Sequence, residues 1–384
     1  MLLHKKEKKK LIEELPFPLA NLYQDTMYTY ACFFKRDDTE KEVQNPLWNV
    51  LKTAQFLMKF VAFISLEHYS NLRNEVCDFD LNRELLDNLQ AYSPDWFSLA
   101  KKINDVLSEA NISNNTLPEL KRLLEYNINF KGNIPPNFPE KINKYKYYQW
   151  FEVMMFFQNL KEYLLNGLYR FQLPSQEVIE FYIHLLEVVL LHCDVIKADV
   201  YILVGKDERK SRGFLCKSTR IKSIGIRGAF DIPWNDLQDK PFIWPDGQKN
   251  YLSLYPLVIS WLVRQKGYTA FSDLLFYSHR TQDKIYYYSY RNNTILPHDV
   301  CDETVLAQWQ TWFRWLEKHT SRRKKQESLN SKSKIVQETT FVLESQHKIF
   351  HDLVEKLQYN IAGYYYFRTN ANRIKEHVVN YLLS

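Results

Sequence analysis

The glycines of this chain are few and unevenly placed. Six of the nine glycines lie between residues 205 and 267. Glycine weakens the interior of a helix, and it serves in turns, bulges and bends between strands. The distribution therefore predicts a helical first half followed by a β-rich segment, which is an α+β fold.

Apolar periodicity supports helices before residue 195. Apolar residues between Leu47 and Tyr69 recur near the 3.6-residue period, and Asn45 and Pro46 mark the start of this helix. Ser93-Pro94-Asp95 and Ser175 open later helices, whereas the proline-rich stretch at 132–139 is a loop. Further helices are expected at 95–107, from 117, at 145–173 and at 175–193. The sequence predicts an N-terminal helical bundle over residues 1–195.

The pattern changes near residue 196. Val200 to Val204 is a β-branched apolar run, and Gly205 then indicates a turn. Other strands are expected at 212–216, 223–230, 241–244 and 251–259, with a hairpin formed by 274–277 and 284–290. We predict a central antiparallel β-rich domain at 196–300, a helix at 301–320, a basic linker at 321–334 and C-terminal helices at 335–384.

Composition points to the cytoplasm. The five cysteines are odd in number and form no C-x-x-C pair, which favours reduced thiols over a zinc site or redox pair. The lysine-rich N-terminus precedes no apolar run of the kind found in signal peptides. No uninterrupted apolar stretch reaches the roughly 18 residues that a membrane span needs. We expect a cytoplasmic protein without membrane contact.

Catalytic signatures are missing from the sequence. It contains no G-x-x-x-x-G-K-[ST], no G-x-G-x-x-G and no G-x-S-x-G. A triad assembled from distant residues stays open, because spacing along one chain does not reveal it. The sequence favours a non-enzymatic protein without a cofactor.

Two weak metal patterns occur on expected helices. His347 and His351 share a helix face, but the glutamate of H-E-x-x-H is absent. Glu180, His184 and Glu187 share another face, but the second Glu-x-x-His copy of a di-iron bundle is lacking. We therefore expect no metal site.

One spacing resembles that of a known nuclease family. Arg291 and His298 match the loose R-x(4–6)-H spacing of HEPN-type ribonucleases. That resemblance implies an arginine and a histidine flanking a scissile phosphate. The family carries its motif on a helix, whereas Asn292, Asn293 and Pro297 predict a turn here. A HEPN-like ribonuclease is the least favoured of three hypotheses.

Basic residues gather in three clusters. The first is Lys5 to Lys10. The second and third are Lys206, Arg209, Lys210, Arg212, Lys217, Arg220 and Lys222, and then Arg322, Arg323, Lys324 and Lys325. With a formal net charge of +6, such clusters suit phosphate contacts. Nucleic-acid binding by the second and third clusters is the alternative hypothesis.

A tyrosine-rich hairpin supplies a candidate recognition surface. Tyr286, Tyr288 and Tyr290 alternate along an expected strand, which suits a partly exposed pleated surface. We predict that these tyrosines contact a partner.

Three segments carry a resemblance to a known kind of module. They are LPFPLANLY at 15–23, LSLYPLVISW at 252–261, and LLFY at 274–277 followed by IYYYSYR at 285–291. They resemble helical-plus-β modules of bacterial multidomain signalling and conflict proteins, where such modules accompany kinase, peptidase or STAND-type NTPase domains. The resemblance implies a sensing or scaffold subunit of a signalling or anti-phage defence system. Its effector would be a separate protein chain, and the C-terminal helices also allow a homodimer.

Overall fold

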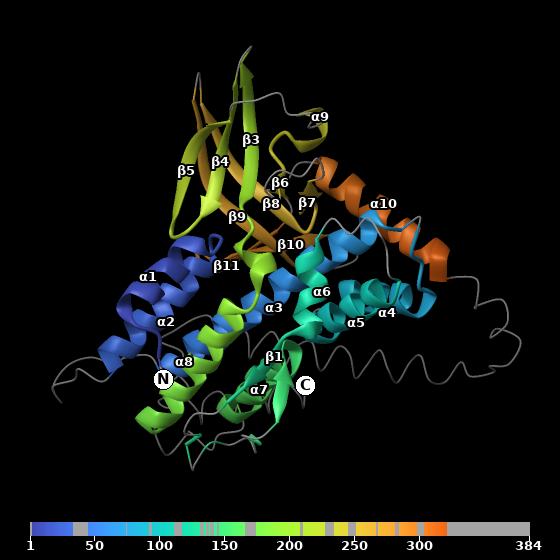
Figure 1. Ribbon diagram of the computed structural model, residues 1–384. Helices are drawn as coiled ribbons and strands as arrows, with labels where there is room; N and C mark the ends of the chain where they lie inside the picture. Colours follow the sequence, from blue (N-terminus) through green and yellow to red (C-terminus); the bar gives the residue numbers. More distant parts are fainter. Residues whose placement is uncertain are drawn as a thin grey trace, which may run out of the picture.

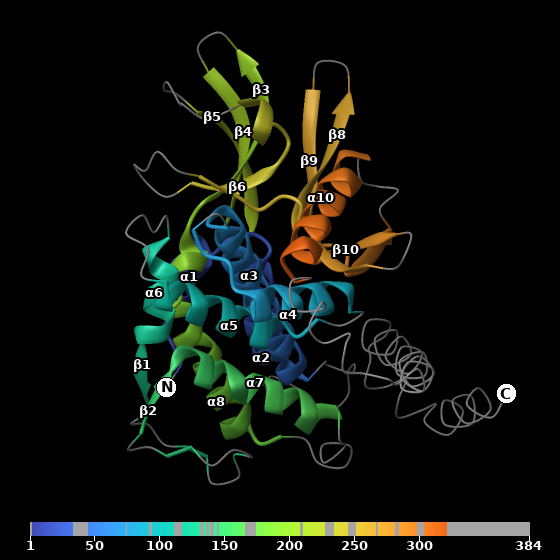
Figure 2. The ribbon, with the colours of Figure 1, turned by 90° about the vertical axis from the view of Figure 1, so that its right-hand side faces the viewer.

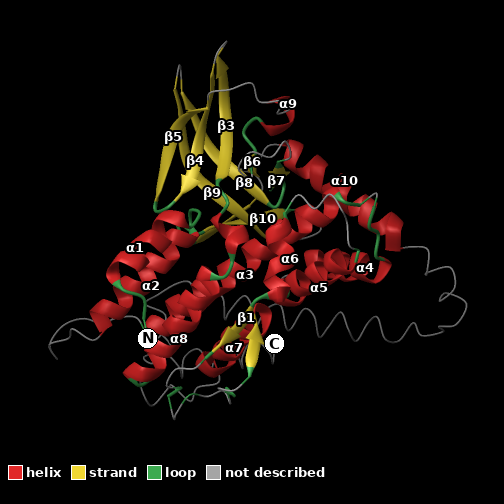
Figure 3. Ribbon diagram, in the orientation of Figure 1, coloured by secondary structure: helices red, strands yellow, loops and turns green. Residues whose placement is uncertain are grey.

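Helices and antiparallel sheets occupy different parts of the molecule. In the computed structural model the helices form the lower body, and the sheets stand above them (Figures 1 and 3). The predicted α+β fold is confirmed. The structure describes residues 2–320 except 34–44, 74, 92–93, 111–116, 131–133, 136–137, 139–141, 144–145, 166–173, 208–209, 227–233, 245–250, 266–267, 281–283 and 298–302. The predicted linker and helices at 321–384 lie outside the described residues.

Helix α3 (Pro46–Asn71) is the centre of the helical body. The Asn45 side chain accepts a hydrogen bond from Leu47 N at 3.0 Å, and Pro46 fits the first turn, so the predicted start is confirmed. Of the described helices, only α3 is long and apolar enough to cross a membrane, yet 83% of that apolar window is buried inside the protein. It is therefore placed as a core helix. The helices that contact it are α2 (Leu19–Phe33), α5 (Trp96–Glu109), α7 (Trp150–Leu165) and α8 (Gln176–Leu191).

Short polar side chains cap three of the other helices. Asp78 accepts from Leu81 N at 2.7 Å, and Asp95 accepts from the N–H groups of the first turn of α5. Ser175 caps α8 in the same way, so the starts predicted at Asp95 and Ser175 are confirmed. The remaining helices of the body are α1 (Lys5–Glu14), α4 (Phe79–Gln90) and α6 (Pro118–Glu125), with the 3-10 turn η2 (Asp194–Lys197) after α8.

A small two-stranded sheet interrupts the helical body. β1 (Asn127–Asn129) pairs antiparallel with β2 (Tyr147–Gln149). The helix predicted from residue 145 was therefore wrong at its start, because α7 begins at Trp150. The three residues of β2 alternate exposed, buried and exposed, which is the period of a strand. Buried Tyr148 packs against Phe130 and Phe156, and these ring contacts hold the strand on the helices.

The larger sheet has five antiparallel strands in the order β5-β4-β3-β6-β7. They are β3 (Val200–Asp207), β4 (Lys210–Lys217), β5 (Arg220–Ile226), β6 (Pro241–Ile243) and β7 (Leu252–Ser253). Short helix α9 (Trp234–Leu237) lies between β5 and β6 in the chain. The strands predicted at 200–204, 212–216, 223–230 and 241–244 correspond to the first four. The order makes β5 one edge of the sheet.

The smaller sheet has the order β11-β10-β9-β8. Its strands are β8 (Val258–Gln265), β9 (Tyr268–Arg280), β10 (Ile285–Ser289) and β11 (Thr294–Pro297). The predicted hairpin around residues 279–283 is the β9–β10 pair. The single strand predicted at 251–259 is instead two strands, since a turn containing the cis Tyr255–Pro256 bond separates β7 from β8.

Two hairpins rise from the top of the body. Figure 2 shows that β3 and β4 form one hairpin and that β8 and β9 form the second. The rings of Phe214 on β4 and Phe271 on β9 lie 5.6 Å apart and join the two sheets. On the other side of the larger sheet, β6 approaches β8. The hairpins thus share a base while β5 faces outward.

Helix α10 (Glu303–Thr320) closes the structure across the smaller sheet and α4. Trp309 Nε1 donates to Tyr287 Oη at 2.9 Å, and Trp312 Nε1 donates to Ser70 Oγ at 2.8 Å. Most buried apolar residues of the helices, of both sheets and of α10 form one continuous cluster, and Leu203, Leu237 and Phe242 form a small second cluster on the larger sheet. The boundary predicted at residue 195 therefore marks a change of secondary structure, and the two sides share one core.

Candidate functional site

The second basic cluster lies on the β3–β4–β5 hairpins. Opposed residues of antiparallel strands share a face, and alternate residues point to opposite faces. The β4–β5 register places Lys217, Arg220 and Lys222 on one face and Arg212 on the other. Lys206 and Lys210 belong to β3 and β4, whereas Arg209 lies outside the described residues. Among the side chains that the structure describes, the predicted cluster is therefore divided between the two faces of the sheet.

The outer face of β5 keeps exposed positive charge. Arg220 and Lys222 are exposed. Lys217, on the same face, is engaged with Asp199, with its Nζ 2.6 Å from Oδ1. On this face of the described sheet Arg220 and Lys222 thus remain as an exposed pair at alternate positions of an edge strand.

The C-terminal end of helix α1 meets the same corner of the sheet. Ser218 N donates to Leu15 O at 2.7 Å, and Phe17 N donates to Cys216 O at 3.3 Å. These bonds fasten the end of α1 to the β4–β5 turn (Figure 1). Lys9 and Lys10 are exposed on α1, about 8 to 9 Å along the helix axis from Leu15 at 1.5 Å per residue. Lys9 and Lys10 form weak, exposed ion pairs with Glu13 and Glu14, one helical turn later. The sequence did not predict the contact between the end of α1 and the β4–β5 turn, because nearly 200 residues separate the two segments.

The predicted tyrosine surface is mostly interior. Tyr288 is only 6% exposed, and Tyr290 packs against Phe56 of α3 with ring centroids 4.4 Å apart. Tyr286 is half-buried and stacks on His279 at 4.5 Å. The prediction was wrong for Tyr288, because α3 covers one face of the smaller sheet and α10 covers the other, whereas Tyr290 is half-buried like Tyr286.

Arg291 has a structural contact in place of the predicted catalytic one. Its Nη1 donates to Ser272 O at 2.7 Å and holds the β10–β11 turn on β9. Nearby Asp273 is buried and accepts hydrogen bonds from Ser289 Oγ and Leu274 N. Burial raises the pKa of Asp273 above its usual range, and these hydrogen bonds oppose that rise. His298 lies outside the described residues, so the ribonuclease hypothesis gains no support.

The acidic residues of α8 bind other parts of the fold. Glu187 is 1% exposed and accepts hydrogen bonds from Tyr23 Oη and Leu3 N, both at 2.8 Å. Lys8 Nζ lies 3.5 Å from the same carboxylate. Glu180 accepts from Tyr30 Oη at 2.6 Å. Within the described part of the chain no group of His, Cys, Asp and Glu is arranged to hold a metal ion; His347 and His351 lie outside it.

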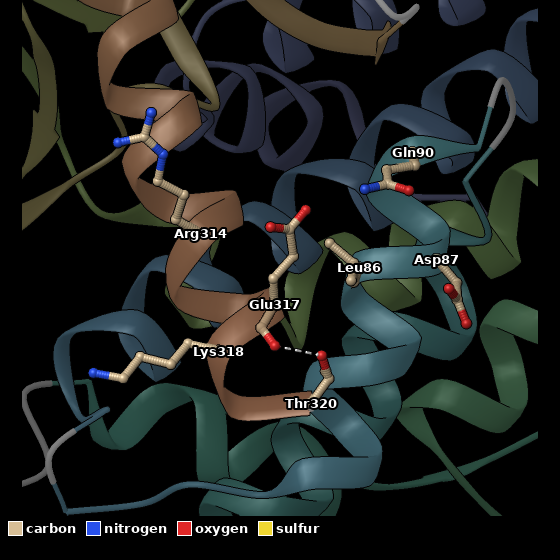
Figure 4. Close-up of a pocket in the computed structure, with 7 residues that line it drawn as sticks. All are labelled: Leu86, Asp87, Gln90, Arg314, Glu317, Lys318 and Thr320. Atoms are coloured by element: carbon tan, nitrogen blue, oxygen red, sulfur yellow. Dashed lines mark hydrogen bonds between the residues drawn. The ribbon is translucent and has the colours of Figure 1, made fainter. Parts of the chain in front are cut away.

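A polar groove lies between α4 and α10. Figure 4 shows Glu317 extending from α10 into the space between the two helices. Thr320 Oγ1 donates to Glu317 O at 2.9 Å and finishes the last turn of α10. The groove has both signs of charge on its walls and was not predicted. Its lining residues are Leu86, Asp87, Gln90, Arg314, Glu317, Lys318 and Thr320.

The third basic cluster, Arg322 to Lys325, lies outside the described residues. Comparisons of the chain with protein-family models, with curated proteins and with solved structures gave no match. The resemblance to bacterial signalling and defence modules therefore stays a prediction.

Proposed function

We propose that this chain is a non-enzymatic recognition or scaffold subunit of a bacterial signalling or anti-phage defence system. It acts in the cytoplasm and binds a separate protein chain that carries the effector activity. The sequence resemblance at 15–23, 252–261 and 274–291 supports the kind of system, and the arrangement of the fold supports the mode of action.

The observation that carries the proposal is a single core with two upright hairpins. The helices, both sheets and α10 pack into one hydrophobic cluster, so the base of the hairpins is held rigidly. Above that base, β5 forms an exposed edge on the larger sheet. A rigid body that presents strand edges is suited to binding other chains, because strand edges offer unpaired backbone groups.

The buried carboxylates Glu187 and Asp273 hold elements of the fold together, which supports a structural role for them. Glu187 joins α8 to α2 and to the N-terminal segment, and Asp273 joins two strands of the smaller sheet. Neither carboxylate lines the groove between α4 and α10. Each serves as a hydrogen-bond acceptor that closes the fold.

Nucleic-acid binding is the second candidate. The hydrogen bond from Ser218 N to Leu15 O favours it, because it places the exposed Lys9 and Lys10 of α1 within about two helical turns of the β4–β5 turn. Phosphate contacts release counterions, so such binding would fall steeply as salt is raised. Binding of a DNA or RNA oligomer that is indifferent to salt would count against it.

The deciding experiment is purification of the tagged full chain from its native cells, with and without nuclease treatment. We expect one stoichiometric protein partner that remains after nuclease treatment and that re-forms the complex from purified components. A partner lost on nuclease treatment would favour the nucleic-acid candidate. Turnover of a substrate by the isolated chain would overturn the non-enzymatic assignment.

A further inference from the structure

The outer edge of β5 is a strand edge that no other strand pairs with among the described residues. β5 pairs with β4 on one side over all seven residues, Arg220 to Ile226. In an antiparallel edge strand every second residue turns its N–H and C=O away from the neighbour, which leaves about three residues free to pair with another strand. A partner strand that ran alongside all seven residues of β5 would be about 23 Å long, at roughly 3.3 Å per residue.

The other edges offer less to a partner. β7 has two residues and β11 has four. β8 is long enough, but Ser260 Oγ donates to Asp239 O and Arg264 pairs with the Asp239 carboxylate. Asp239 N in turn donates to Leu203 O at 2.7 Å, so this turn lies along β8 and ties it to the larger sheet. β5 is therefore the long edge that faces outward.

Space and charge beside β5 both favour an incoming strand. A Cβ built on Gly225 would meet no atom within 4 Å, so the sheet face that carries Arg212 is uncovered at that position. Arg220 and Lys222 are exposed at alternate positions on one face. Cross-strand neighbours on one face lie about 5 Å apart, and opposite charges there attract.

Cations on an edge strand also have a protective role. They discourage pairing with identical or neutral strands and so limit aggregation. The same charges select a strand that carries acidic residues at alternate positions, because only that strand neutralises them. Protection and selection are thus two effects of one charge pattern.

We propose that β5 binds an acidic extended segment of a partner protein as an added antiparallel strand. Its backbone hydrogen-bonds to the outer edge of β5, and its alternate carboxylates lie opposite Arg220 and Lys222. This proposal rests on the proposed function, since it names the surface by which the subunit holds its partner.

The first experiment uses the full chain and a nine-residue peptide of alternating Glu and Val, labelled for fluorescence anisotropy at about 0.15 M salt. Controls are the same peptide with Lys for Glu, the Glu–Val peptide N-methylated at its internal amides, and a single-stranded DNA oligomer of equal charge. We expect the Glu–Val peptide to bind on the order of tenfold or more tighter than either peptide control, since both charge and backbone pairing contribute.

The second experiment compares the double variant Arg220→Glu, Lys222→Glu with the matched variant Lys101→Glu, Lys121→Glu. The control residues are exposed on α5 and α6, so both variants make the same change in net charge. We expect the β5 variant to weaken peptide binding on the order of tenfold and the control to change it less than about twofold. Equal melting temperatures show that both variants fold.

Three results would overturn the inference. They are equal binding of the N-methylated peptide, stronger binding of the DNA oligomer than of the peptide, and no peptide binding at all. A protein partner that purifies with the chain and stays bound to the β5 variant would refute the β5 surface and leave the proposed function standing. Absence of any partner would count against the proposed function itself.

Discussion

The buried bond between Tyr23 and Glu187 should be one of the largest single contributions of a side-chain hydrogen bond to stability. Tyr23 Oη donates to Glu187 Oε1 at 2.8 Å, and both side chains are almost fully buried. Burial and then the neighbouring Glu187 carboxylate raise the pKa of the Tyr23 phenol above its usual range, so the phenol keeps its proton and stays a donor.

The size of the effect can be worked from these contacts. A hydrogen bond to a charged acceptor contributes about 1.5 to 3 kcal/mol to stability. Tyr23→Phe removes the donor and leaves the carboxylate with Leu3 N and Lys8, so we expect a loss of about 2 kcal/mol. For a chain of 384 residues that loss lowers the melting temperature by roughly 2 to 3 °C.

The assay is a double-mutant cycle of Tyr23→Phe and Glu187→Gln, followed by thermal and urea unfolding with tryptophan fluorescence. We expect a coupling free energy of about 1.5 kcal/mol or more between the two sites. Tyr30→Phe is the matched control, because Tyr30 donates to Glu180 in a half-buried setting and should cost below about 1 kcal/mol. A coupling below about 0.5 kcal/mol would show that the buried pair is not the determinant we infer.

Two further predictions test the sheet and the core. Gly213→Ala should destabilise the protein by more than about 2 kcal/mol, because its Cβ would overlap the carbonyl oxygen of Ile202, whereas Gly225→Ala should be near neutral; equal urea midpoints would contradict the packing of β3 on β4. Glu67→Gln should stabilise the protein at pH 7. Among the described residues Glu67 Oε1 has no hydrogen-bond partner, and burial raises the pKa of this carboxyl well above its usual range. The pKa of the Glu67 carboxyl is higher in the folded protein than in the unfolded chain, where it is near 4.3. The protein is therefore most stable with respect to this group below about pH 4.3, and it loses that stability as the pH rises toward the folded-state pKa. The gain in free energy of unfolding from Glu67→Gln should therefore be smaller at pH 4 than at pH 7. Urea unfolding of both proteins at both pH values measures it, and an equal gain at the two pH values would contradict the prediction.

Local signals in the sequence were enough for many elements of the fold. Asn45, Asp95 and Ser175 cap helices with their own side chains, so the chemistry of each start lies within a few residues. The β9–β10 hairpin could also be predicted locally, because its two β-branched and aromatic segments are joined by a short turn. Such features need no knowledge of distant parts of the chain.

Long-range features could not be read in the same way. The face on which Arg212 lies depends on the β4–β5 register, and composition does not fix a register. Tyr288 looked suited to a partly exposed strand, yet α3 and α10 cover both faces of its sheet. The meeting of α1 with β5 depends on the bond from Ser218 to Leu15. Each of these outcomes is decided by residues more than a few turns away in sequence.

The single hydrophobic cluster also limits how such a chain can be divided or rearranged. Cutting it near residue 195 would strip Phe276 and Tyr290 from Phe56 and leave large apolar faces open on both fragments. Neither fragment would be a domain that could be transplanted by itself. Recombination during evolution would therefore have to move both sides of residue 195 together, and a split reporter cut at this point would regain its fold only when both halves meet.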